Sequence, residues 1–336
     1  PINPNPPVTI MVFIQNFYIN KKIKYIFKYL KLIIYMLSNL TVIIVTYKTD
    51  QNILRNCINS IDRKVKIKII ENSENFENKE IFENDFSNLS IYCTGKNLGM
   101  GNGNNFGINH VKTRYVLILN PDTICDANFF IKINEYFTKE IKFSIIGATY
   151  KNEKTYSASG YFEENIKKNN INGYSTQTPS LKKVDWVMGC SMLIDLDKFS
   201  SKKLFDENFF LYFEEFDLCK RIKDKEEDVF VSKDLIIDHL GNMGSFAADK
   251  NLKFDAEKLR EWHWMWSTFY FYKKNYGFFY ALKKTMGKLL RSFVKMIYYY
   301  LIFNRVLKAK YTCRFMGLLN SIFGKKSWYR VNSKYQ

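Results

Sequence analysis

Short apolar runs alternate with segments of helical spacing through the first half of this chain. The run LTVIIVTY at 40–47 is continuous and rich in β-branched residues, which is typical of a strand buried on both faces. Similar strands are predicted at 65–70, 89–93, 115–119 and 143–149, with helical segments after Asp50 and near 105–112 and 126–140. Because strands and helices alternate, we expect an α/β fold with a mostly parallel central sheet flanked by helices.

A different pattern begins after residue 250. Between 285 and 326, single lysines and arginines interrupt apolar and aromatic runs, so no run approaches the ~18 uncharged residues of a membrane-spanning helix. The pattern predicts a basic, amphipathic helical extension over 251–336 that associates with an anionic membrane surface. Two alternatives stay open: an ordinary helical extension packed on the domain, and a nucleic-acid-binding segment.

The formal net charge of +18 on 336 residues is distributed unevenly along the chain. Residues 1–39 carry +5, residues 40–250 carry −2, and residues 251–336 carry +15. This distribution predicts a near-neutral catalytic or binding domain over 40–250 between two basic extensions. Since a nucleic-acid cleft would need basic charge within 40–250, we expect no nucleic-acid partner.

The N-terminal extension 1–39 lacks the order of basic, apolar and small residues that defines a signal peptide. It begins without Met, and Met36 lies four residues before the first predicted strand, so we expect either an extension upstream of the native start or a second interfacial helix. The six cysteines contain no C-x-x-C pair, which argues against a zinc ribbon and a disulfide framework and favours a reduced, intracellular protein.

Polar residues follow four of the predicted strands, at 46–47, 71–73, 95–97 and 120–122. Because the carboxyl ends of parallel strands meet at one edge of a sheet, these clusters predict a ligand site there. The segment NLGMGNGNNFG at 97–107 adds four glycines, which let the backbone approach a ligand and expose amides before a helix. It matches neither the dinucleotide nor the P-loop fingerprint, and a plain flexible turn is the alternative.

Four carboxylates and one histidine are candidates for chemistry. Asp122 ends an apolar strand and suits a hard divalent cation, which needs one or two carboxylates beside a ligand's phosphates; a helix N-cap is the alternative. Glu214, Glu215 and Asp217 lie among aromatic residues, where a raised carboxyl pKa suits a general base; a solvated helix start is the alternative. His239 closes another apolar run, where a lone histidine is more often structural.

In combination, these segments resemble the inverting glycosyltransferases of family 2, and within them the rhamnosyltransferase-like bacterial branch. The matching motifs, in order, are VIIVTYK at 42–48, IIENSE at 69–74, NLGMGNGNNFG at 97–107, LILNPDT at 117–123, VDWVMGCSMLI at 184–194, FDENFFLYFEEFDLCKR at 205–221 and DHLGNMGS at 238–245. The resemblance implies a GT-A type nucleotide-binding fold, a nucleotide-sugar donor, a divalent metal ion (Mg²⁺ or Mn²⁺) and inversion at the anomeric carbon.

The resemblance also assigns roles to individual residues. Those that would contact the donor are Thr46, Tyr47, Glu71, Asn97, Gly99, Gly101, Asn105 and Asn120. Asp122 and His239 would hold the metal, and Trp186, Gly189 and Asp217 would form the acceptor side. Glu215, with Glu214 beside it, would be the base that takes the proton of the acceptor hydroxyl. Glu71 and Glu215 stand where Asp is more usual in the family, which moves each carboxylate outward by one methylene.

We therefore expect an enzyme that moves a sugar, such as rhamnose or another hexose, from a TDP- or UDP-sugar to a glycan or lipid-linked glycan acceptor in cell-surface polysaccharide synthesis. We expect it in the cytoplasm, peripheral on the inner face of the membrane. A relative with a galactofuranosyl, glucosyl or N-acetylhexosaminyl donor is one alternative. A catalytically silent nucleotide- or glycan-binding scaffold in a polysaccharide-assembly complex is another, and the two Asp-to-Glu departures keep it open.

Overall fold

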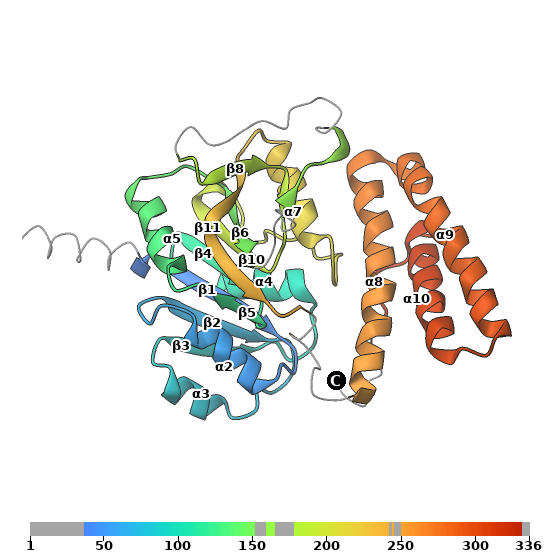
Figure 1. Ribbon diagram of the computed structural model, residues 1–336, viewed down its shortest axis with the longest axis horizontal. Helices are drawn as coiled ribbons and strands as arrows, with labels where there is room; N and C mark the ends of the chain where they lie inside the picture. Colours follow the sequence, from blue (N-terminus) through green and yellow to red (C-terminus); the bar gives the residue numbers. More distant parts are fainter. Residues whose placement is uncertain (1–36, 152–158, 165–177, 242–243, 245–249, 331–336) are drawn as a thin grey trace, which may run out of the picture.

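The computed structural model describes residues 37–151, 159–164, 178–241, 244 and 250–330 (Figure 1). Its strands are β1 (Leu40–Thr46), β2 (Lys66–Glu71), β3 (Leu89–Cys93), β4 (Tyr115–Leu119), β5 (Thr123–Cys125), β6 (Ile145–Tyr150), β7 (Ser159–Gly160), β8 (Leu181–Val184), β9 (Trp186–Val187), β10 (Ser191–Asp195) and β11 (Val229–His239). Its α-helices are α2 (Gln51–Asn59), α3 (Lys79–Asp85), α4 (Met100–Asn109), α5 (Phe129–Thr138), α7 (Glu214–Lys223), α8 (Lys250–Tyr276), α9 (Phe278–Leu301) and α10 (Arg305–Ile322). Most of the N-terminal extension 1–39 lies outside the described residues.

One sheet organises the described part of residues 40–241. Its strands follow the order β3-β2-β1-β4-β10-β6-β11-β5, and β8 also pairs with β11. The pairs β2–β3, β1–β2, β1–β4 and β6–β11 are parallel, whereas β10, β5 and β8 run antiparallel to their neighbours. All the strands of this sheet except β10, β5 and β8 therefore run in the same direction. This confirms the predicted α/β fold of GT-A type, with a mostly parallel central sheet flanked by helices.

Both faces of the sheet are buried, as the continuous apolar run of β1 predicts. Val42 and Ile44 point into a core formed with α2, α3 and α5, and Ile43 and Val45 point into a second core formed with α4 and α7. Successive strand side chains alternate between faces, so a strand covered on both sides needs apolar residues at every position. The carboxyl end of β1 is thereby held rigidly between two layers of helices.

The glycine-rich segment 97–107 is mostly helical, because α4 begins at Met100 and not near 105 as the sequence pattern suggests. Its glycines let the helix lie close to the sheet. A Cβ atom on Gly103 would come within 2.8 Å of the Val45 side chain, and one on Gly107 within 2.7 Å of the Ile43 side chain. Close helix–sheet packing thus accounts for glycines that the sequence analysis attributed to ligand approach.

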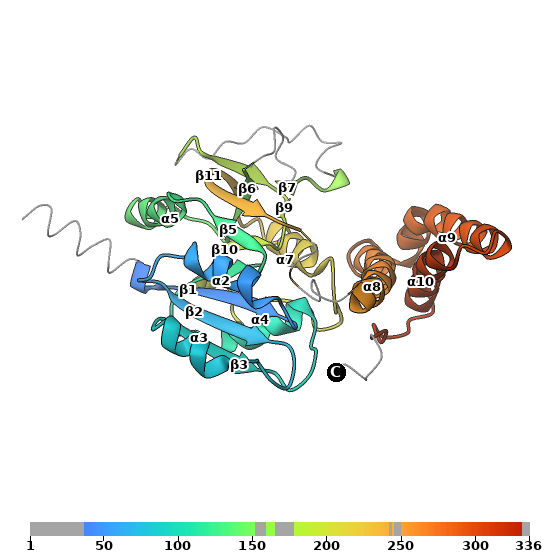
Figure 2. The same cartoon turned by 60° about the horizontal axis from the view of Figure 1, so that its bottom comes forward.

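The C-terminal residues form three helices, which confirms the predicted helical extension. Met265 and Phe269 of α8 pack with Ala281 of α9 and Leu318 of α10 in a separate small core. Helix α8 lies between the sheet domain and the α9–α10 pair in both views (Figures 1 and 2). The predicted domain boundary at 250/251 falls at the start of α8 and stays a prediction. Within the described residues, none of the helices combines the length and apolar character that crossing a membrane requires.

Candidate active site

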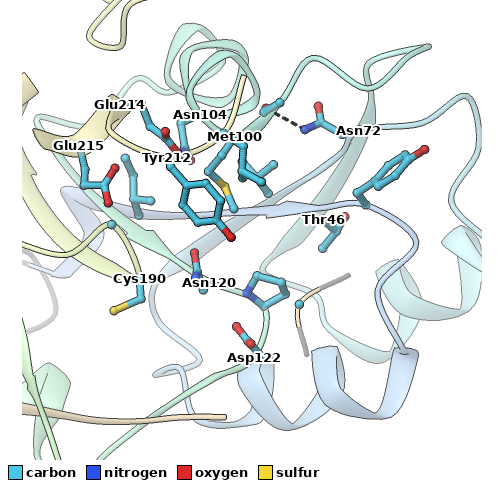
Figure 3. Close-up of a pocket in the computed structure, with 18 of the residues that line it drawn as sticks. Thr46, Asn72, Met100, Asn104, Asn120, Asp122, Cys190, Tyr212, Glu214 and Glu215 are labelled. Atoms are coloured by element: carbon cyan, nitrogen blue, oxygen red, sulfur yellow. Dashed lines mark hydrogen bonds between the residues drawn. The ribbon is translucent and has the colours of Figure 1, made fainter. Parts of the chain in front are cut away.

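A cavity of about 370 Å³ lies at the carboxyl ends of β1 and β4. Four elements contribute to its wall: the start of α4, the loop before β10, the segment 205–215 and one side of α8. Figure 3 shows Glu214 and Glu215 at one end, Thr46 and Asn72 at the other, and Asn120 between them. The volume falls within the range of small-molecule sites, which is about 300–1,000 Å³. Ligand-sized space therefore exists where the strand-end clusters predict it.

The end of β1 is tied to the end of β2. Thr46 pairs with Glu71 in the parallel register, and its hydroxyl donates to the Glu71 carboxylate at 2.6 Å. The same carboxylate accepts the backbone N–H of Lys48 at 3.2 Å and the Ser73 hydroxyl at 2.7 Å. Glu71 is buried and does not line the cavity, while Thr46 and Tyr47 do. Glu71 therefore orients the Thr46–Lys48 backbone instead of facing the ligand space.

Tyr47 and Asn97 form the rim of the cavity on the same side. Burial raises the pKa of the Tyr47 phenol, and a hydrogen bond to Asn97 opposes that shift. The Asn97 side-chain oxygen also accepts the backbone N–H of Gly99 at 3.0 Å, so Asn97 joins the β1 end to the start of α4.

Gly99 brings α4 against the segment that carries the two glutamates. Its φ of 85° favours glycine, and a Cβ atom there would lie 2.2 Å from the Phe210 carbonyl oxygen. The next residue, Met100, donates its backbone N–H to that oxygen at 2.9 Å. The neighbouring Asn72 amide donates to the Gly99 carbonyl at 2.9 Å (Figure 3). This close approach forms the wall shared by α4 and the segment before α7.

Asp122 and His239 meet although 117 positions separate them in the chain. Strand β5 pairs antiparallel with β11, with Thr123 opposite His239, and the backbone N–H of Leu240 donates to the Asp122 carbonyl at 3.0 Å. The His239 Nε2 atom consequently lies 3.2 Å from the Asp122 carboxylate and 3.4 Å from the Asn120 amide nitrogen. All three residues line the cavity.

Glu214 and Glu215 begin α7 and line the opposite end of the cavity. Tyr212 and Phe213 before them have φ values of 67° and 70°, a left-handed turn that bulky side chains rarely adopt. Both carboxyl groups are buried, and the Oε2 atom of each has no hydrogen-bond partner among the described residues. Two consecutive carboxylates are thus held out of water and facing the ligand space.

Burial dominates the titration of this pair. Desolvation raises the pKa of Glu215 to about 7. Desolvation and the neighbouring Glu215 charge raise the pKa of Glu214 well above its usual range. The N-terminus of α7 favours negative charge but offsets only part of this effect. Burial and the neighbouring charge thus favour the protonated form of Glu214, and burial places the pKa of Glu215 where a general base can exchange a proton near neutral pH.

Besides Glu71, four of the residues assigned to the site lie outside the cavity wall. The Asn105 side chain clamps the backbone of Phe205, donating to its carbonyl at 2.8 Å and accepting its N–H at 2.9 Å. Gly101 packs against Phe205 and Glu214. Trp186 lies 4.6 Å from the Phe216 ring, measured between centroids. Asn105, Gly101 and Trp186 therefore support the residues of the cavity wall without lining the cavity themselves.

Asp217 is the fourth, and it is fully buried in an ion-pair cluster. Arg221 of α7 approaches its carboxylate at 2.9 Å, and Lys274 of α8 at 2.8 Å. The aromatic surroundings that pointed to chemistry at this position instead enclose a link between α7 and α8. Gly189, by contrast, lines the cavity. A Cβ atom added to Gly189 would lie 3.6 Å from the Cβ atom of Glu215.

Sequence reasoning missed several residues of the cavity wall, among them Asn72, Asn104, Met188, Tyr212 and Arg260. Asn72 lay within a quoted motif, and its place after β2 was a usable signal. Asn104 also lay in a quoted motif, and its side-chain oxygen is buried without a hydrogen-bond partner among the described residues. Arg260 belongs to α8, whose position against the sheet domain no local pattern reveals.

The residues present fit a divalent cation. Asp122 supplies carboxylate oxygens and His239 an imidazole nitrogen at one point of the cavity, a donor set that Mn²⁺ and Mg²⁺ accept. No group of three or more His, Cys, Asp or Glu residues in the described chain forms a complete cage. A metal there would take its other ligands from a bound diphosphate and water, as hard cations at phosphate sites do.

The sequence comparisons agree with this geometry. Residues 41–195 match the profile of the family described as glycosyl transferase family 2. The low-salt glycan biosynthesis hexosyltransferase Agl10 of Haloferax volcanii is 26% identical over 219 residues, covering 62% of this chain and 68% of that protein. The rhamnosyltransferase WbbL of Escherichia coli is 28% identical over 185 residues, covering 49% of this chain and 69% of that protein.

Among solved structures, that of GalNAc-T7 with UDP, GalNAc and Mn²⁺ has a TM-score of 0.47 and 14% identity, over 69% of this chain. The chain spans 50% of the length of that structure's chain. The family profile and the two relatives confirm the resemblance to glycosyltransferase family 2. The profile ends at residue 195, before Glu214, Glu215 and His239.

Proposed function

We propose that this glycosyltransferase, whose residues 41–195 carry the family 2 domain, moves a hexose from a nucleotide diphosphate to a hydroxyl group of a glycan or lipid-linked glycan, with inversion at the anomeric carbon. The sugar is rhamnose or another hexose, and the donor is a TDP- or UDP-sugar. The relatives' names, a rhamnosyltransferase and a hexosyltransferase of glycan biosynthesis, support this choice of sugar class and a role in cell-surface polysaccharide synthesis.

One observation carries the proposal. Three buried oxygens in the cavity wall, Asn104 Oδ1 and the Oε2 atoms of Glu214 and Glu215, lack hydrogen-bond partners among the described residues. Buried acceptors without donors are costly, so a ligand that brings several hydroxyl groups gains by binding there. Sugars carry many such groups, and an acceptor hydroxyl that donates to Glu215 is placed for deprotonation.

The chain's own residues then account for the transfer. Glu215 takes the proton of the acceptor hydroxyl, whose oxygen forms a bond to the anomeric carbon as the bond to the leaving diphosphate breaks on the opposite face. Glu214, whose pKa is raised by burial and by the Glu215 charge, keeps a second carboxyl group beside the base. Attack on one face with departure from the other inverts the configuration at that carbon. Asn72, Thr46 and Tyr47 line the end of the cavity that receives the nucleoside.

Asp122 and His239 would hold the divalent metal ion, Mg²⁺ or Mn²⁺. When bound, such an ion neutralises the charge that develops on the leaving diphosphate. The Asn120 amide lies beside His239 in the middle of the cavity. Because Glu214 and Glu215 lie at one end and Thr46 at the other (Figure 3), we infer that the acceptor and the nucleoside occupy opposite ends.

Thermal stability with nucleotides tests the proposal. The midpoint is measured with UDP, TDP and GDP, each with and without Mn²⁺, on the wild type and on Asp122→Ala, because a ligand that binds the folded state raises the midpoint by mass action. We expect a Mn²⁺-dependent rise with UDP or TDP that Asp122→Ala abolishes. Sugar transfer lost in Glu215→Gln with nucleotide binding retained would support the base assignment.

The rival function is a silent nucleotide- or glycan-binding scaffold, and the same experiment separates the two. Nucleotide binding without release of free nucleotide from any UDP- or TDP-sugar, in the presence of glycan acceptors, would favour the scaffold. A folded wild type whose midpoint responds to none of the three nucleotides would contradict the donor site itself.

A further inference from the structure

Helix α9 exposes an apolar stripe that no described element covers. Its exposed members are Met286, Leu290, Phe293, Val294, Ile297 and Leu301. At about 100° per residue, these six positions fall within an arc of roughly 100° on the helix surface. Phe279 at one end of the helix and Phe303 just beyond the other are 84% and 90% exposed. Apolar side chains of this size rarely gather on a surface without a partner.

The rest of α9 explains why this stripe is on the outside. The buried side chains of α9 are Ala281, Thr285 and Ser292, and Ala281 joins the small core that α8 and α10 share. Helix α9 therefore already satisfies its packing with these two helices through a different face. It lies at the edge of the molecule away from the sheet, with α8 between it and the sheet domain (Figures 1 and 2).

The charges beside the stripe are all positive. No Asp or Glu occurs after Glu261 in the whole sequence. On α9 and α10, four basic side chains outside the inner face are exposed and make no ion pair within the described chain: Lys283, Arg291, Arg305 and Lys308. Among the basic residues of these helices that do pair, Lys310 and Arg314 contact Glu261 of α8, and Lys284 contacts Glu163. The four unpaired side chains leave exposed positive charge on α9 and α10.

We propose that α9 is a docking surface for an anionic phospholipid bilayer, with the stripe inserted among the acyl chains near the headgroups and the four basic residues on lipid phosphates. A helix with one apolar face, flanking basic residues and aromatic ends is suited to lie in the plane of the interface. A protein partner would also cover apolar residues, but the unbroken positive charge favours a surface that is negative throughout. This inference concerns α9 and does not depend on the reaction proposed above.

Vesicle sedimentation with the full chain tests the docking surface. We expect the wild type to bind vesicles that contain phosphatidylglycerol and to bind pure phosphatidylcholine vesicles weakly, with binding to the former falling as salt rises. Leu290→Asp combined with Val294→Asp should lower the partition coefficient by at least about tenfold, because both side chains leave the apolar phase. Lys283→Gln and Arg291→Gln should each lower it by up to about fivefold.

The matched control places the same change elsewhere on the surface. Ile81 of α3 and Ile131 of α5 are 53% and 57% exposed, close to the 58% of Leu290 and 62% of Val294. The double variant Ile81→Asp, Ile131→Asp should bind vesicles like the wild type. Equal binding by both double variants would overturn the proposal.

A second copy of the chain is the competing occupant, and light scattering tests it. If the wild type is a dimer that Leu290→Asp with Val294→Asp converts to a monomer, while vesicle binding is weak and insensitive to phosphatidylglycerol, the stripe is a self-association surface and the proposal is wrong. A monomer that binds vesicles through the stripe supports it. Thermal midpoints near that of the wild type verify that both double variants are folded.

Discussion

The Nε2 atom of His239 lies 3.2 Å from the Oδ1 atom of Asp122, inside the cavity. The contact depends on the antiparallel pairing of β11 with β5, which places His239 opposite the residue that follows Asp122. A lone histidine after an apolar run is usually structural, yet here its side chain faces the ligand space beside a carboxylate. The geometry therefore joins the end of β11 to the metal and diphosphate end of the proposed site.

His239→Ala should weaken Mn²⁺ affinity at least about tenfold, because it removes one of the two donors that the protein offers the ion. The measurement is the Mn²⁺ concentration that gives half of the UDP-dependent rise in thermal midpoint. His110→Ala is the control, since His110 is exposed just after α4 and contacts the Phe106 carbonyl. An unchanged Mn²⁺ requirement in His239→Ala would remove His239 from the proposed metal site.

The rate of sugar transfer should rise with pH through about 7. Burial raises the pKa of Glu215 to about 7, and a general base acts only when it is ionised, so activity is lost on the acid side. Glu215→Gln should lower kcat by about 10²–10⁴-fold. Glu214→Gln should leave the ascending limb of the profile near pH 7, because burial and not the Glu214 charge raises the pKa of Glu215. A profile whose ascending limb lies near pH 4.5 would contradict the role of Glu215.

The same pair should make stability depend on pH. A carboxyl whose pKa is raised on folding contributes stability below its unfolded pKa and loses it as pH rises through the folded pKa. Glu214→Gln removes this loss, so its thermal midpoint should exceed that of the wild type by more at pH 8 than at pH 5. A difference of 1 kcal/mol corresponds to about 2–4 °C in a protein of this size class. If the difference in thermal midpoint between Glu214→Gln and the wild type were the same at pH 5 and pH 8, the result would contradict a raised pKa at Glu214.

Arg260 should contribute to binding of the diphosphate. It lines the cavity from α8 and forms no ion pair in the described chain, so its charge faces the ligand space. Arg260→Met should lower the affinity for UDP about tenfold and change that for uridine much less, because only UDP carries the diphosphate. Calorimetric titration measures both. Lys253→Met, at an exposed position of the same helix, is the control, and an equal loss for uridine would indicate a purely structural role.

Gly99→Ala should impair both stability and donor binding. Its Cβ atom would overlap the Phe210 carbonyl oxygen at 2.2 Å, and the left-handed φ of 85° adds strain. We expect a loss of at least about 2 kcal/mol in the free energy of unfolding, measured by urea denaturation. Gly287→Ala is the matched control: nothing lies within 4 Å of its Cβ position on α9, so it should be neutral or stabilising by up to about 1 kcal/mol. Equal effects would contradict the close approach.

The sequence predicted the parts of the site that are local to a strand end. Thr46, Asn97 and Asp122 follow buried strands, and the structure brings them to one edge of the sheet because parallel strands end together. It failed where a role depended on which way a side chain faces. Asp217 and Asn105 lie within the right motifs, but one pairs with Arg221 and Lys274 and the other clamps Phe205.

By itself, the sequence determined the α/β class, the positions of the first strands along the chain and the basic character of the C-terminal helices. Apolar periodicity and charge are local properties of the chain. Only the tertiary structure decided that His239 joins Asp122, that Glu214 and Glu215 are desolvated together, and that Arg260 of α8 completes the cavity. The exposed stripe of α9 is also a tertiary result, because a helix's outward face is defined only once its inner face has packed. Long-range contacts set burial, and burial sets both pKa and exposure.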